Sequence, residues 1–416
     1  MTPHSRAFLR RLSLLLAGLS MFGPFSIDTI FPAFPELGRD FAATPLAIQQ
    51  TISAYMISYA LMSLLHGPLS DARGRRPVIL VGIALFVLSS IGAALSQTLT
   101  QLLIFRAAQG ASAGVGMIVG RAVIRDLLDG EEAQKLMSQT SMIFAVAPAI
   151  APVVGGWILG WSSWHMIFWV LASFSVVMLV ACWLWLSETH PPERRIPMNV
   201  ASLVGGNWEV IRNPHFALLC AATCFGFGSL FLYISSAPVF ILDILGLNQQ
   251  QFAWFFVPMI SGFLVGAFLS GRMAGRVPPL KGAMIGFACS GIGLALNLAY
   301  NLAVDEARVP WAVMPMILNT IGMGIAMPAL TLAALDMYPH RRGSAASMHS
   351  FTMLAWNTIL AGAVSPLVSH HRNVMATVAV VMWAVGLAMF WWWLRVRRVD
   401  VPEPLEAELA AEQGAA

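Results

Sequence analysis

Charge is scarce in this sequence: only 11% of its 416 residues are Asp, Glu, Lys or Arg. Lysine occurs twice, as Lys135 after Gln134 and as Lys281 after Leu280. Because a phosphate-binding loop ends in Gly-Lys-Ser or Gly-Lys-Thr, the chain encodes no ATP-driven motor of that kind. It also has no His-Glu-x-x-His zinc helix, and its four cysteines form no Cys-x-x-Cys pair. The sequence therefore predicts no metal and no cofactor.

Apolar residues, in contrast, make up 58% of the chain, and the mean hydropathy is +0.73. A chain of this composition cannot cover one core with a polar surface, so it belongs in a membrane. An α-helix needs about 20 apolar residues to cross the hydrocarbon layer of about 30 Å. Stretches of that length predict an all-α membrane protein with about twelve transmembrane helices. They lie at residues 9–31, 46–66, 78–97, 100–121, 136–159, 164–186, 216–238, 250–271, 281–303, 310–334, 344–368 and 374–394.

The basic residues predict the orientation of these helices, because positively charged loops stay on the cytoplasmic side. If both termini are cytoplasmic, 20 of the 24 Lys and Arg residues fall on that side. Only Arg39, Arg308 and Arg372 fall outside, and Arg106 lies within a span. The basic residues are spread over separate short loops rather than gathered on one face, so they predict no nucleic-acid partner.

A long polar interruption at residues 187–213 divides the spans into two sets of six. The halves echo each other: Pro32-Ala33-Phe34 ends the first span and Pro238-Val239-Phe240 ends the seventh. Parallel six-helix repeats recur in transporters, with the substrate site between the repeats. The expected domains are an N-terminal bundle at 1–190, a cytoplasmic linker at 191–213, a C-terminal bundle at 214–398 and an acidic disordered tail at 399–416.

The segment GPLSDARGRRP at residues 67–77 is the most highly charged loop. Gly67 and Gly74 are expected to allow tight turns, Asp71 to pair with an arginine or cap a helix, and Arg75 and Arg76 to hold the loop at the anionic inner surface. These features predict a charged latch between the second and third spans. The alternative is that the loop only anchors the topology.

This loop resembles the signature loop of the major facilitator superfamily, in which it gates movement between the two halves. Three more segments are similar to the drug:proton antiporter branch, and specifically to its bicyclomycin and chloramphenicol resistance group. They are SIDTIFPAFPEL (26–37), RAAQGASAGVG (106–116) and APAIAPVVGGWI (147–158). The resemblance implies a major facilitator fold of two six-helix bundles in the bacterial inner membrane. It also implies a monomer that exports small drug-like compounds in exchange for protons, by alternating access.

The fifth span carries the antiporter part of this resemblance. Pro148, Pro152, Gly155 and Gly156 fit the antiporter helix, in which prolines bend the helix and glycines allow close contact between helices. Ala147 and Ala151 stand where the family usually has glycines. A kinked packing helix is the purely structural reading of the same residues.

Two ionisable residues stand out within the apolar spans, Asp28 and Arg106. Each costs at least about 2.5–3.5 kcal/mol at the centre of a bilayer, so each is a candidate for function. Both fall near the outer ends of their spans and are expected to approach each other. We expect Asp28 to bind the coupling proton and Arg106 to tune it, because burial disfavours the carboxylate and a nearby guanidinium favours it. The alternatives are an acid at the interface for Asp28 and a static pin between helices for Arg106.

The second half is expected to supply most of the substrate surface. The candidates are polar or aromatic residues near mid-span: Tyr55, Tyr59, Tyr233, Asn319, Trp356 and Asn357. The 23 methionines could repack around varied apolar ligands. Residues of these types at helical spacing are also common in the core or on the lipid face. His349 is a further titratable residue, for which a satisfied hydrogen bond is the alternative.

Three classes of function remain. The leading one is proton-coupled export of small apolar or amphipathic compounds, with the lipid bilayer, protons and a small-molecule substrate as partners. The second is export of a metabolite such as a sugar, purine or amino acid by the same machinery. The third is a channel or a membrane enzyme, although the resemblance implies no enzymatic activity.

Overall fold

The computed structural model describes residues 6–128, 130–195, 198, 200–338 and 342–397. The expected acidic tail at 399–416 lies outside these residues. The described chain is helical and contains no strand, which agrees with the all-α prediction. Several helices begin where the sequence provides a cap followed by an early proline. Thr44 accepts a hydrogen bond from the backbone of Ala47 with Pro45 next to it, and Asn213 caps the helix that starts at Pro214.

The first half consists of seven α-helices and one short 3₁₀ turn. They are α1 (Arg6–Asp28), η1 (Phe31–Ala33), α2 (Phe34–Asp40), α3 (Pro45–Arg73), α4 (Arg75–Ala94), α5 (Leu99–Leu127), α6 (Gly130–Leu159) and α7 (Trp164–Trp185). The 3₁₀ turn η2 (Pro192–Arg194) and helix α8 (Val200–Arg212) lie in the expected linker.

The second half begins at α9 and contains two short π-helical segments. Its elements are α9 (Pro214–Ser235), η3 (Val239–Ile244), η4 (Gln249–Gln251), α10 (Ala253–Met273), α11 (Pro279–Ala303), α12 (Met314–Asp336), α13 (Arg342–Ile359), η5 (Leu360–Val364), α14 (Ser365–Val368) and α15 (Arg372–Arg397).

Ten helices among the described residues are long and apolar enough to cross a membrane, and Val146–Leu159 forms a shorter apolar helix. Two of the twelve expected spans, 46–66 and 136–159, lie inside α3 and α6 and are not among the ten. The 29-residue α3 is long enough. It buries a series of hydroxyl and amide side chains, which lowers its mean hydropathy. The structure therefore supports a multi-pass membrane protein.

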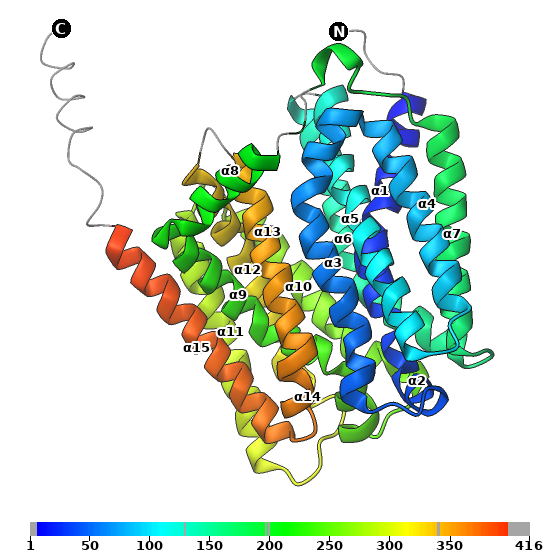
Figure 1. The fold of residues 1–416 in the computed structure, drawn as a ribbon. Helices are drawn as coiled ribbons and strands as arrows, with labels where there is room; N and C mark the ends of the chain where they lie inside the picture. Colours follow the sequence, from blue (N-terminus) through cyan, green and yellow to red (C-terminus); the bar gives the residue numbers. More distant parts are fainter. Residues whose placement is uncertain (1–5, 129, 196–197, 199, 339–341, 398–416) are drawn as a thin grey trace, which may run out of the picture.

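Helices α1 and α3–α7 pack against one another, as do α9–α13 and α15, so the two sets lie side by side (Figure 1). The start of α1 and the end of α15 lie at the same end of the molecule, here called the terminal side. Helices α2 and α14 lie at the opposite end, called the far side. The two sets meet mainly through α3 with α13 and through α6 with α10.

Candidate functional site

Asp28 is the last residue of α1, and its side chain is buried on the far side of the first half. The helix ends there because Pro32 cannot continue its hydrogen-bonding pattern, and the chain turns into η1. Arg106 on α5 is the charged residue that interacts electrostatically with the carboxyl group. In the described part of the chain, however, no ion pair joins the two side chains. The Asp28 carboxyl is thus buried near a cation without being neutralised by direct contact.

Arg106 is fully buried, and its hydrogen bonds go to groups other than the Asp28 carboxyl. Its Nε donates to the Thr51 carbonyl at 3.2 Å, and its Nη1 donates to the Ser26 carbonyl at 3.1 Å and the Ser26 hydroxyl at 3.0 Å. Nη1 also donates to Gln109 Oε1 at 2.9 Å, and the guanidinium lies 4.4 Å from the centroid of the Tyr55 ring. Nη2 is buried without a hydrogen-bond partner. The guanidinium is therefore held by groups on three helices, α1, α3 and α5, and Nη2 is left without a partner.

The three residues that accept hydrogen bonds from Arg106 were not singled out by the sequence analysis: Ser26, Thr51 and Gln109. Gln109 follows Arg106 by three residues, a spacing that places two side chains on one helix face. It extends the network by donating to Ser90 Oγ at 2.8 Å. The sequence signal was therefore present in the spacing around Arg106. No sequence pattern, however, indicated that Ser26 and Thr51 from other helices would converge on the same group.

This geometry predicts that Arg106→Lys will lose nearly as much function as Arg106→Ala. A lysine keeps the charge but cannot donate to Thr51, Ser26 and Gln109 at once, because it lacks the planar fork. Each buried acceptor left without a partner costs about 1–3 kcal/mol. We expect both variants to unfold at lower temperature in detergent and to transport poorly. Near-normal transport by Arg106→Lys would instead support a role through charge alone.

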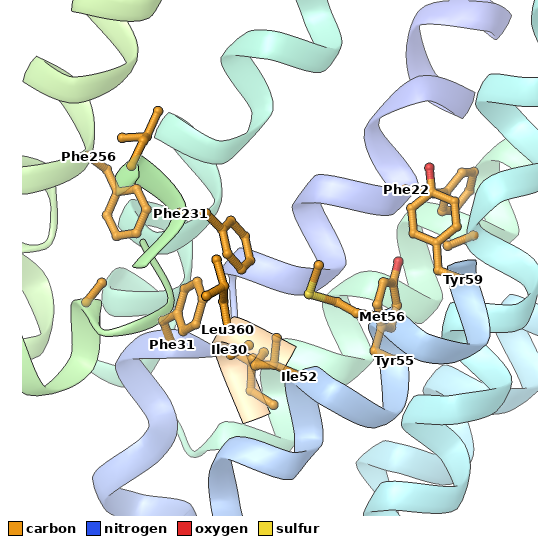
Figure 2. Close-up of a cluster of buried hydrophobic side chains, with 14 of the residues drawn as sticks. Phe22, Ile30, Phe31, Ile52, Tyr55, Met56, Tyr59, Phe231, Phe256 and Leu360 are labelled. Atoms are coloured by element: carbon orange, nitrogen blue, oxygen red, sulfur yellow. The ribbon is translucent and has the colours of Figure 1, made fainter. Parts of the chain in front are cut away.

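A cluster of apolar side chains from both halves closes the far side next to Asp28. Figure 2 shows Ile30 and Phe31, which follow Asp28, gathered with Ile52, Phe231, Phe256 and Leu360. All six are buried. Phe31 and Phe256, from opposite halves, are stacked with ring centroids 6.3 Å apart. We call these six residues the far-side seal, because they pack the two halves together around Ile30 and Phe31, which follow Asp28 in the chain.

Helix α6 meets both Asp28's neighbourhood and the other half through two adjacent glycines. A Cβ atom on Gly155 would collide with the carbonyl oxygen of Thr29, and one on Gly156 would collide with the carbonyl oxygen of Gln249 in η4. Pro148 and Pro152 lie inside the same helix. The four residues of the expected antiporter helix therefore lie within the continuous helix α6, and its glycine end touches the backbone of both halves.

A second crossing joins α3 to η5. Gln50 Nε2 donates to the Gly362 carbonyl at 3.1 Å, and a Cβ atom on Gly362 would collide with Ser53 Oγ. Gln49 Nε2 donates to the Ser235 carbonyl at 3.1 Å in a buried contact. Both crossings lie towards the far side, where the halves are held by close backbone approach and side-chain hydrogen bonds.

The expected latch at 67–77 forms at the terminal side, but its geometry differs from the sequence prediction. Gly67 lies inside α3, so the expected turn there is wrong: the helix continues through Gly67 and Pro68 to Arg73. Gly74 does provide the turn, with φ at +99°. That value favours glycine, and it lets α4 begin at Arg75.

Arg75 does not face the inner surface as expected, because acids on two other helices draw it inwards. It is buried and donates to Asp71 at 2.5 Å, to Asp126 at the end of α5 at 3.0 Å, and to Ser70 at 2.6 Å. Arg76 donates to the Trp183 carbonyl at 2.8 Å. The latch therefore ties the ends of α3, α5 and α7 to the start of α4.

Glu188, which follows α7, is a part of the latch that the sequence analysis missed. Its carboxylate accepts hydrogen bonds from the backbone N–H groups of Arg75 at 2.9 Å and Arg76 at 3.3 Å. These are unpaired donors at the start of α4, where a negative charge is favourable. A Cβ atom on Gly74 would collide with the same carboxylate. An acid in a polar linker gives no sequence signal of a contact with a helix more than 100 residues earlier.

The six expected substrate residues fall on several helices. Tyr55 and Tyr59 lie on successive turns of α3, with ring centroids 6.3 Å apart. In the second half, the Tyr233 hydroxyl accepts from Asn297 at 2.5 Å, and Asn319 Oδ1 accepts from the Ser290 hydroxyl at 2.6 Å. Both side chains thus bind residues of their own bundle, although Asn319 Nδ2 is buried without a hydrogen-bond partner.

Trp356 and Asn357 on α13 are less committed. Trp356 packs on Phe225 with ring centroids 4.3 Å apart. Its Nε1 and the Oδ1 atom of Asn357 are buried without hydrogen-bond partners. His349 on the same helix is also buried, and its Nε2 lacks a partner, so the reading of a fully satisfied histidine is wrong. These residues remain candidates because their polar atoms are free.

Together, the paired helical bundles, the buried acid near a fixed arginine and the charged latch define a multi-pass membrane transporter. Comparison with known proteins assigns it further: residues 14–361 match the profile of the Major Facilitator Superfamily, and the chain belongs to this family. The solved bacterial homologue of the human lysosomal transporter Spinster, in an inward-facing and unoccupied conformation, shares the fold. The TM-score is 0.74 at 16% identity, over 96% of this chain and 100% of that one.

Sequence relatives bear out the resemblance to the resistance group. The chain is 32% identical to the uncharacterized MFS-type transporter YdgK of Bacillus subtilis, over 90% of this chain and 92% of that one. It is 26% identical to the bicyclomycin resistance protein homolog of Haemophilus influenzae, over 85% and 88%. It is 28% identical to the chloramphenicol resistance protein of Pseudomonas aeruginosa, over 81% and 79%.

Proposed function

We propose that this protein exports small, apolar or amphipathic drug-like compounds across the bacterial inner membrane in exchange for protons. The two halves expose the substrate alternately to the two sides, and Asp28 carries the coupling proton. The terminal side is cytoplasmic, because it holds most of the basic residues. The protein works as a monomer, with protons as coupling ion and no other cofactor.

The observation that supports this proposal most directly is the state of Asp28. In a buried carboxyl group near an arginine, with no ion pair to it, burial favours the neutral acid and the guanidinium favours the carboxylate, so the group is suited to changing its protonation state. The far-side seal lies beside it, so opening and closing of the halves changes the side from which water reaches the carboxyl group. A carrier with these two properties can exchange a proton for a substrate.

The relatives named for drug resistance support a drug-like substrate, and the second half offers an apolar interior for it. Within the described spans α9–α13 and α15, no Asp, Glu, Lys or Arg side chain lies near the middle of a helix. Export of a sugar, purine or amino acid by the same machinery is the alternative that a substrate panel would reveal.

The test uses purified protein in proteoliposomes loaded with a pH-sensitive dye. We expect chloramphenicol and bicyclomycin to drive proton movement in the opposite direction, and an imposed pH gradient to drive uphill accumulation of either compound. Empty liposomes provide the control for passive permeation. Drug flux without proton movement would contradict the coupling, and proton movement driven only by sugars, purines or amino acids would support the metabolite alternative.

A further inference from the structure

When the two halves are in contact at the far side, a proton released from Asp28 towards the terminal side has to cross most of the length of α1. Asp28 ends a helix of 23 residues that starts at the terminal side. At 1.5 Å per residue, the carboxyl group lies roughly 30 Å from that side. On the shorter route, towards the far side, the residues that follow Asp28 are packed in the far-side seal. A proton released from Asp28 must therefore leave along the first half or through the space between the halves.

Helix α3 carries a buried polar stripe along this direction. Its members recur at three- or four-residue spacing, which places them on one helix face. All are buried, although they are polar or carry a hydroxyl group. They are Tyr55, Tyr59, Ser63, His66 and Ser70. A polar stripe buried over four turns is costly in a membrane unless it has a function or is fully paired.

The two tyrosines at the far end of the stripe are adjacent to the Asp28–Arg106 site. The Tyr55 ring lies under Arg106, and its hydroxyl donates to the Gly23 carbonyl at 3.2 Å. A Cβ atom on Gly23 would lie 3.6 Å from the Tyr59 hydroxyl. Figure 2 shows both hydroxyls pointing the same way from successive turns of α3. Two phenol groups therefore converge on one turn of α1, just before Asp28.

His66 continues the stripe towards the terminal side. Both the Tyr59 ring and His66 Nδ1 pack against Gly114 of α5, with Nδ1 3.1 Å from the position of a Cβ atom there. The Ala111 backbone hydrogen-bonds the imidazole, whereas Nδ1 is buried without a partner. One turn further on, Ser70 Oγ accepts from Arg75 of the latch at 2.6 Å. The imidazole thus lies between the Asp28–Arg106 site and the latch, with one nitrogen free.

Other titratable groups on the helices around α3 leave this nitrogen open. None of them forms a hydrogen bond or ion pair with His66 in the described chain. They include Arg75 and Arg76 on α4, His349 on α13, and Arg106, Arg121, Arg125 and Asp126 on α5. Arg121 instead interacts electrostatically with Tyr59. A neutral imidazole with a free, buried nitrogen is a proton acceptor whose charged form has no fixed counter-ion, so it would hold a proton only briefly.

We propose that His66 is a second proton-binding residue, which receives the proton from Asp28 and passes it to the terminal side. The inference rests on the proposed function. The O–H bond of Asp28 breaks and an N–H bond forms at His66 Nδ1, leaving a carboxylate and an imidazolium. The phenol groups of Tyr55 and Tyr59 and intervening water molecules carry the proton between them. The imidazolium then gives its proton to water at the terminal side, and the neutral ring is restored.

The experiment compares His66→Gln with His371→Gln, which removes an exposed histidine between α14 and α15 by the same chemical change. Stopped-flow measurement of chloramphenicol-driven proton release is combined with counterflow exchange, which needs no net proton movement. We expect His66→Gln to slow proton release by about tenfold or more, to change its pH profile and to leave exchange intact. His371→Gln should match the wild type in both measurements.

Two outcomes would overturn the proposal: wild-type proton release in His66→Gln, or an equal loss of release and exchange, which would indicate a structural role. A second variant, His66→Ala, separates loss of the proton-binding group from misfolding. It leaves a space that imidazole from the buffer can fill, and only a folded protein can regain proton release in this way. Restored release with imidazole supports the proposal, and its absence in a folded His66→Ala protein contradicts it. Asp28→Asn is measured alongside, because proton release that persists there would refute the proposed carrier whatever His66 does.

Discussion

Asp28→Asn is expected to abolish substrate-driven proton release and uphill drug export, while substrate binding and downhill exchange survive. Asparagine resembles the protonated acid in shape and neutrality, so the protein stays in the proton-loaded form. Because Asp28 forms no ion pair with Arg106 in the described chain, the substitution leaves the hydrogen bonds of Arg106 to Ser26, Thr51 and Gln109 in place. The loss would therefore concern coupling rather than folding.

The size of the effect follows from the energy that one proton supplies. A membrane potential of about 100 mV and a pH difference of about 1 unit together supply about 3.7 kcal/mol per proton. That energy supports a gradient of roughly 500-fold for a neutral drug. In Asp28→Asn the accumulation ratio should fall to unity, which a radiolabelled drug in proteoliposomes would measure.

The matched control for this variant is Asp243→Asn, which removes an exposed acid of the far side by the same chemical change. It should couple like the wild type. Undiminished proton release from Asp28→Asn would refute Asp28 as the carrier and direct attention to His66 or His349.

Gly156→Ala is expected to prevent the far side from closing and to stop transport. The added methyl group would overlap the Gln249 carbonyl of the other half, and a backbone carbonyl cannot rotate away as the end of a flexible side chain could. The state described here would be disfavoured, whereas a state with the halves apart at this crossing would not. A small-to-large change at such a site costs typically about 1–3 kcal/mol, enough to shift a balanced two-state equilibrium by roughly 5- to 150-fold.

The shift can be measured with a membrane-impermeant thiol reagent on Ser236→Cys, a buried far-side position whose hydroxyl contacts Ser365 of α14. Labelling should be faster when Gly156→Ala is also present. Gly271→Ala on α10 is the control, because a Cβ atom there meets no atom within 4 Å. Equal labelling with and without Gly156→Ala, together with normal transport, would contradict the role of this crossing.

Local properties of the sequence were sufficient to predict the helices and much of the site. Helix ends at Thr44, Asn213 and Gly74 follow from caps and turn residues that act over one turn. Asp28 and Arg106 stand out because a charge within an apolar run has few explanations. Gly67 shows the limit of such reasoning, since a glycine permits a turn but does not require one, and here α3 continues through it.

The composition and the spacing of apolar and charged residues thus determined the class of protein and the residues most worth testing. They predicted twelve spans, and ten helices among the described residues are long and apolar enough to cross a membrane. Only the tertiary structure decided which groups meet: Arg106 with Ser26 and Thr51, Arg75 with Asp126, Glu188 with the start of α4, and Gly156 with Gln249. Periodicity reports which face of a helix is apolar. It does not indicate which helix packs against that face, because in a helical bundle the neighbouring helix is selected by packing between segments far apart in the chain.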